Sequence, residues 1–82
     1  MTGRELLDAM TRTGQEVDAR KLAIKSGLVT AEKAALMTCH DICNVLAKEY
    51  VMVSQEVEKD RITLVRKEDE ETYWRMVKCL NR

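Results

Sequence analysis

The sequence predicts an α+β domain that is mainly helical and carries one small β-hairpin. Up to about residue 50, apolar residues recur at the three- and four-residue intervals typical of helices. Between residues 51 and 65 the pattern changes to the period-two alternation of strands, and after residue 69 the helical spacing returns. The chain has 82 residues, the size of one small domain, and contains no apolar run long enough to cross a membrane.

The first predicted helix begins at the capping box of residues 2–5, in which the Thr2 side chain accepts a hydrogen bond from the third backbone N–H that follows it. It is expected to end near Gly14, because glycine readily adopts the left-handed conformation that terminates helices. Residues 15–17 are predicted to be a short extended stretch with Val17 pointing inward.

A second helix is expected over residues 19–26, with Asp18 as its N-cap and Gly27 at its end. After this corner, Thr30 is the expected N-cap of a third, longer helix that reaches about Tyr50. The apolar residues of that helix share one face by their spacing. The predicted buried stripe is Ala35, Leu36, Cys39, Ile42, Cys43, Leu46 and Tyr50.

The alternating residues 51–57 and 62–65 are predicted to pair as an antiparallel hairpin around the polar corner 58–60. A last helix is expected over residues 69–81. The predicted order of elements is therefore α-β-α-α-β-β-α.

That order resembles a winged helix-turn-helix domain spanning residues 1–82. The helix-turn-helix would cover about 18–50, the wing about 51–67 and the C-terminal helix about 69–81. The resemblance implies a small transcriptional regulator that binds duplex DNA without a cofactor, of the kind carried by phages, plasmids or bacterial operons.

Around the corner, Leu22-Ala23 followed by Gly27-Leu28 resembles the general helix-turn-helix pattern. Lys33 departs from it, because a compact turn would place a branched apolar residue there. The turn is therefore expected to be longer than in compact repressors.

Basic residues gather in two stretches, although the 14 basic and 14 acidic residues leave no net charge. If the resemblance holds, the helix after Gly27 would enter the major groove and the wing would touch the backbone. The implied phosphate contacts are Arg20, Lys21, Lys25, Lys33, Lys59 and Arg61. The implied base contacts are Lys33, Thr38, His40, Asp41 and Asn44.

The same pattern has two other interpretations. A charged surface of this composition is common on proteins that bind nothing there. Neutral net charge, with acidic residues beside each basic stretch, also fits a winged-helix module that contacts a protein, such as a phage-type inhibitor or an adaptor of the transcription machinery.

The three cysteines raise the question of a metal site. Cys39 and Cys43 stand four residues apart on one helical face next to His40, and Cys79 lies far along the chain. Because Cys39 and Cys43 fall within the apolar stripe, they are expected to pack in the core, and no metal or other cofactor is expected. The sequence shows no catalytic motif, so an enzyme is not expected. An odd cysteine count without disulfide-like spacing favours the cytoplasm.

The last helix offers a possible interface. Its apolar residues either complete the core or pair with a second copy across a twofold axis, as a homodimer. The residues of this candidate interface are Tyr73, Trp74, Val77 and Leu80. The acidic run 68–71 before it suits a helix N-terminus, or forms an acidic contact surface or DNA mimic.

Overall fold

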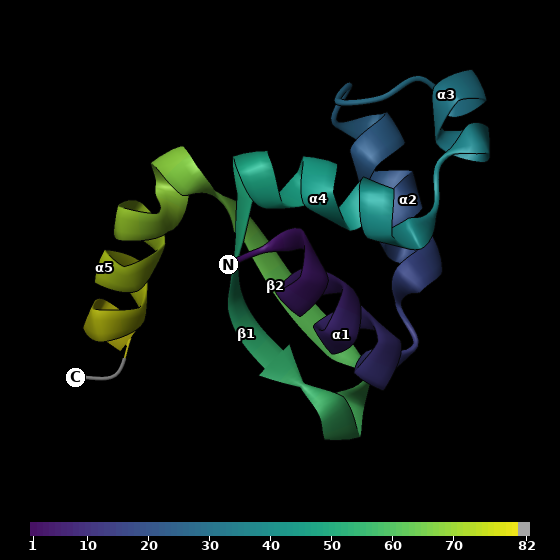
Figure 1. The fold of residues 1–82 in the computed structure, drawn as a ribbon. Helices are drawn as coiled ribbons and strands as arrows, with labels where there is room; N and C mark the ends of the chain where they lie inside the picture. The colour runs from purple at the N-terminus through teal and green to yellow at the C-terminus, as the bar shows by residue number, and fades with distance from the viewer. Residues whose placement is uncertain (81–82) are drawn as a thin grey trace.

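The computed structural model describes residues 1–80 and has the predicted α+β class, mainly helical with one antiparallel hairpin (Figure 1). The elements in chain order are α1 (Gly3–Thr13), α2 (Glu16–Lys25), α3 (Ala31–Leu36), α4 (Cys39–Glu49), β1 (Tyr50–Glu56), the 3₁₀ turn η1 (Val57–Lys59), β2 (Arg61–Arg66), the 3₁₀ turn η2 (Lys67–Asp69) and α5 (Glu70–Leu80). The predicted end of the last helix, residue 81, lies outside the described residues.

Helix α1 has the ends that the sequence predicts. The Thr2 hydroxyl accepts a hydrogen bond from the Glu5 N–H at 3.2 Å, and Gly14 terminates the helix at a φ of 72°. Its buried face includes Leu6 and Met10, which are at most 4% exposed. This face packs across α4, so these two helices form the centre of the core.

The crossing of α1 and α4 is close because residue 3 has no side chain. A Cβ added to Gly3 would lie 2.5 Å from the Cα of Asn44, which is nearer than unbonded carbon atoms approach. The two backbones can therefore touch only with glycine at this position.

The predicted extended stretch at residues 15–17 is wrong, because α2 already begins at Glu16. The side chain of Gln15, and not a strand, connects this segment to the hairpin. Its Oε1 accepts a hydrogen bond from the Ile62 N–H at 3.1 Å, and its Nε2 donates to the Asp60 carbonyl at 2.5 Å. Val17 then lies on the outer side of α2 and is 65% exposed, not inward.

The corner after α2 is as predicted, but the single long helix expected after it is divided into α3 and α4. Gly27 has a φ of 78°, and the Thr30 hydroxyl caps the next helix by accepting from the Lys33 N–H at 3.1 Å. That helix, α3, ends after six residues because Met37 is extended, and Thr38 begins α4 through a capping box with Asp41.

The break changes which residues are buried. The predicted stripe is correct from Ile42 onward, where Cys43 and Leu46 are fully buried. It is wrong at Ala35 and Leu36, both of which are exposed, Leu36 by 90%.

The predicted hairpin is present, with β1 and β2 antiparallel and a bulge between Met52 and Ser54. Asp60 closes the turn at a φ of 50°, without glycine. One face of the hairpin packs on the core through Ile62 and Leu64.

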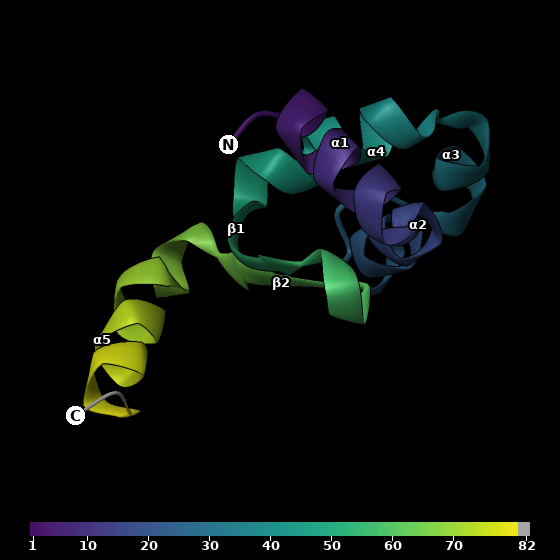
Figure 2. The ribbon, with the colours of Figure 1, turned by 90° about the horizontal axis from the view of Figure 1, so that it is seen from below.

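Helix α5 leaves the end of β2 and extends away from the other helices in both ribbon views (Figures 1 and 2). Its main contacts are with its own connection η2 and with β2, and it contains no buried residue. The predicted alternative in which this helix completes the core is therefore not what the structure contains.

We predict that Gly3→Ala lowers the free energy of unfolding by about 1–3 kcal/mol, because the added methyl group overpacks the α1–α4 crossing. Urea unfolding followed by circular dichroism measures the change. Arg4→Ala is the matched control, since Arg4 is exposed and its ion pair with Asp8 is a surface contact. Equal stability of the two variants would contradict the predicted role of Gly3.

Candidate interaction surface

The fold leaves the apolar side of α5 exposed. Trp74 is 44% exposed, Met76 59% and Leu80 81%. Tyr73 and Val77 lie on the same side and are half-buried. The predicted interface residues thus share one face, and Met76 joins them. Its spacing from Tyr73 and Leu80 is the sequence signal for this, since it stands three residues after one and four before the other.

Two contacts hold the aromatic residues of this face in place. The rings of Tyr73 and Trp74 meet edge to face with centroids 5.2 Å apart. The Trp74 Nε1 donates to the Glu70 carboxylate, one turn earlier, at 3.5 Å. Beside them, an open apolar groove of about 340 Å³ follows the helix. Its lining residues, all on α5, are Thr72, Arg75, Met76, Cys79 and Leu80.

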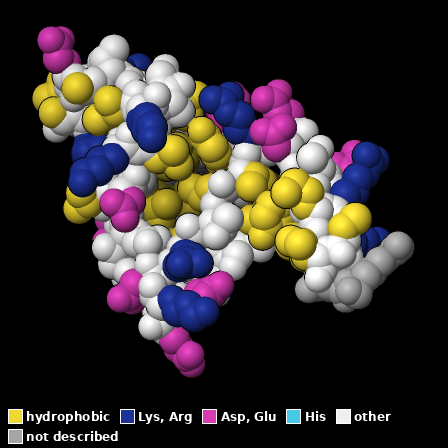
Figure 3. All heavy atoms as spheres, turned by 180° about the vertical axis from the view of Figure 1, so that it is seen from behind, with side chains coloured by type: hydrophobic (Ala, Val, Ile, Leu, Met, Phe, Trp, Pro, Cys, Tyr) yellow, Lys and Arg dark blue, Asp and Glu magenta, His cyan; other side chains and the backbone are white. Residues whose placement is uncertain are grey.

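A second apolar surface lies on the body of the molecule. Seen from behind, hydrophobic side chains line a hollow between α2 and the hairpin (Figure 3). Both elements pack on the central helices but scarcely on each other. The half-buried residues that these elements contribute at the edge of the core are Leu22, Ile24, Ile62 and Leu64. Figure 3 also shows the apolar side of α5 on this same side of the molecule.

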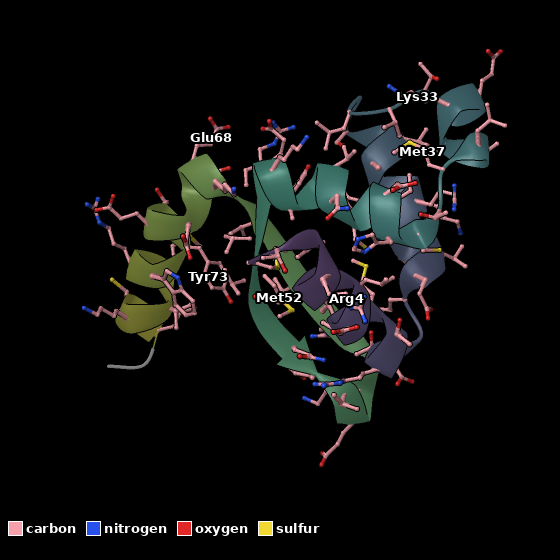
Figure 4. All side chains as sticks on the ribbon, in the orientation of Figure 1. Arg4, Lys33, Met37, Met52, Glu68 and Tyr73 are labelled. Atoms are coloured by element: carbon pink, nitrogen blue, oxygen red, sulfur yellow. The ribbon has the colours of Figure 1, made fainter. Side chains whose placement is uncertain are left out.

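The two predicted basic clusters lie on different elements. Lys33 lies at α3 (Figure 4), whereas Lys59 and Arg61 flank the hairpin turn, which hydrogen bonds of Gln15 join to the start of α2. Within the first cluster, Arg20 is used internally: its guanidinium donates to the carbonyls of Ala34 and Met37 and so holds α3 against α2. Lys59 forms an ion pair with Glu56 at 3.4 Å.

Some of the residues predicted to contact bases have structural roles instead. Thr38 and Asp41 form the capping box of α4. Asn44 lies against Gly3 at the α1–α4 crossing, and His40 has a buried Nδ1 without a hydrogen-bond partner. The helix that was expected to present these side chains is packed on one side by α1 and on another by α2.

The lysines around the corner have no such role. Lys21, Lys25 and Lys33 are exposed, and none of them forms an ion pair with any residue between 1 and 80. They are the members of the first predicted cluster that remain free for an anionic ligand.

The cysteines do not form a common site. Cys43 is fully buried in the core, Cys39 lies at its edge within 3.9 Å of Arg20, and Cys79 is exposed on α5. Among the described residues, no three side chains of the metal-binding types are grouped together. Burial, with the neighbouring Cys39 and Glu16 adding to it, raises the pKa of Cys43 to about 11.

Within the described part of the chain, every helix is too short or too polar to cross a membrane. No protein-family model, curated protein or solved structure matches this sequence.

We predict that a maleimide reagent labels Cys79 rapidly in the folded protein and leaves Cys43 unmodified until the protein unfolds. The thiolate is the reactive form, and a pKa of about 11 leaves only about one thiol in a thousand ionised at pH 8. Mass spectrometry of labelled peptides over time measures both rates. In Cys79→Ser the fast phase should vanish, and equal rates at Cys43 and Cys79 in the wild-type protein would contradict the burial of Cys43.

Proposed function

We propose that this protein is a small protein-interaction module, and that its contact surface is the apolar side formed by α5 and the hollow beside the hairpin. The observation that carries the proposal is the position of α5, which exposes Trp74, Met76 and Leu80 and contains no fully buried residue.

An isolated helix of this kind needs a partner for physical reasons. It has 11 residues, and helices shorter than about 12–15 residues are only marginally stable in water unless they pack on something. Contiguous exposed apolar surface on a small protein is typical of an interface. Aromatic residues and methionine are also the types enriched at such interfaces.

The distribution of charge along the chain also favours a protein partner. The chain has no net charge, and acidic and basic stretches alternate along it, which favours pairing with a surface of mixed charge over a uniformly anionic one. The winged-helix resemblance stays a prediction about the fold, and the proposal does not depend on it, because a fold does not determine a function.

Photocrosslinking from the face of α5 tests the proposal. With p-benzoylphenylalanine at Met76, irradiation in the cells that produce the protein should give a discrete protein adduct. The matched control places the probe at Lys78, an exposed residue of α5 that does not line the apolar groove. An adduct from Met76 that Lys78 lacks supports the proposal, and adducts equally weak at both positions contradict it.

Duplex DNA is a second candidate partner, favoured by the free lysines Lys21, Lys25 and Lys33 around the corner between α2 and α3. Lysines of this kind contact phosphates without reading sequence. Arg20 and Lys59 have internal partners, so the proposed footprint is smaller than the ten residues of the sequence prediction, and binding would be weak.

For DNA binding we predict that Lys33→Glu weakens the mobility shift of a duplex and reduces the slope of log K against log salt by about 1. The melting temperature should not change, since Lys33 is exposed. Lys48→Glu, an exposed charge reversal on α4, is the control. Unchanged affinity of Lys33→Glu would reject DNA as the ligand of this cluster.

A further inference from the structure

The outer edge of β2, on the side away from β1, carries backbone groups without a strand beside them. The Gln15 side chain shows which groups face this edge, because it accepts from the Ile62 N–H and donates to the Asp60 carbonyl. Backbone N–H groups of a strand alternate between its two edges, so the Leu64 N–H faces the same way as that of Ile62. Among residues 1–80, the two Gln15 bonds are the only ones from outside the sheet that reach this edge.

The pairing of the two strands makes β2 the more regular of the two edges. The bulge of the hairpin lies on β1, where Val53 has no partner in the register between Met52 and Ser54. Strand β2 runs without such an interruption from Arg61 to Arg66. A bulge is one of the features by which proteins prevent an edge strand from pairing with another chain. The edge of β1 has this protection, and the edge of β2 does not.

The edge of β2 borders the apolar hollow. The Gln15 bonds join this edge to the residue that immediately precedes α2, so β2 is the strand of the hairpin that faces α2. The hollow between α2 and the hairpin is lined by hydrophobic side chains (Figure 3). Leu22 of α2 and Ile62 and Leu64 of β2 are half-buried at this side of the core. A segment beside β2 would therefore meet both backbone partners and apolar side chains.

The outward backbone groups favour an extended peptide as the occupant. Alternating N–H and C=O groups with strand spacing are paired by another strand, whereas a helix bonds its own backbone groups internally. Addition of a strand to a free sheet edge is a general mode of peptide recognition, in which main-chain hydrogen bonds supply affinity. Helix α2 bounds the hollow opposite β2, which favours a single extended segment over the hairpin of a second folded copy (Figure 3).

We propose that β2 binds an extended segment of a partner protein as the third strand of the sheet, in the hollow between β2 and α2. The outward N–H and C=O groups of Leu64 are its central contacts. The bound segment carries apolar side chains at alternate positions, because successive side chains of a strand point to opposite faces and one face of this sheet packs on the core. The inference rests on the proposed function and names the chemistry of the partner.

Amide hydrogen exchange of the unmodified protein, followed by nuclear magnetic resonance, tests whether the edge is open. The Leu64 amide should exchange at least about tenfold faster than those of Thr63 and Val65, which face β1 in the register. Addition of a bound peptide should slow exchange at Leu64. Equal protection of the three amides in the protein alone would overturn the proposal, because the Leu64 N–H would then already be paired.

Methylation of a single backbone nitrogen tests the strand pairing itself. The probes are peptides enriched from a random phage-displayed library on the wild-type protein, then synthesised and titrated by fluorescence anisotropy. In protein assembled by chemical ligation, a methyl group on the Leu64 nitrogen should weaken binding at least about tenfold. It removes the donor and keeps a neighbouring strand from approaching to the usual spacing of about 4.8 Å. The Leu64 side chain and its packing on the core are unchanged.

The matched control is methylation of the Met52 nitrogen. Met52 lies opposite Leu64 in the register, so its N–H faces the outer edge of β1. This variant should bind the peptides like the wild-type protein, and circular dichroism should show that both variants keep the fold. Equal weakening by both changes, enriched peptides that are all insensitive to Leu64 methylation, or a library without binders would overturn the proposal. A Met76 adduct in cells would then leave the proposed function standing, and its absence would reject both.

Discussion

The backbone contact between α1 and α4 at Gly3 is the constraint on which the rest of the structure depends. It brings α1 so close to α4 that the Leu6 and Met10 side chains fill the centre of the core together with Ile42 and Leu46. Helix α1 packs on one side of α4 and α2 on another. The hairpin follows α4 directly in the chain, and α1 is the helix on which both of its strands pack. The hairpin consequently packs on α1 and leaves a gap on the side of α2, and this gap is the apolar hollow.

Local signals in the sequence predict the ends of the helices well, because each end depends on a few neighbouring residues. Thr2, Thr30, Gly14 and Gly27 act as expected, but the predicted N-cap Asp18 is wrong, because it lies inside α2, whose N-cap is Gln15. The break between α3 and α4 was not predicted, because the apolar spacing continues across it, although Thr38 and Asp41 form a capping box there. Residues 15–17 were misassigned for another reason: the Gln15 side chain replaces strand pairing with hydrogen bonds to residues 45 and 47 positions later, which no local pattern reveals.

The candidate surface was predictable only in part. Helical spacing places Tyr73, Trp74 and Leu80 on one face, but whether that face is covered depends on the direction in which η2 sends α5. The hollow was beyond sequence reasoning, since its walls come from α2 and β2, which are separated by more than thirty residues and do not pack on each other. Composition identifies the charged residues of the two basic clusters but not which of them bind other parts of the chain, and Arg20 is the example. Its guanidinium binds carbonyls that become available only because α3 ends early.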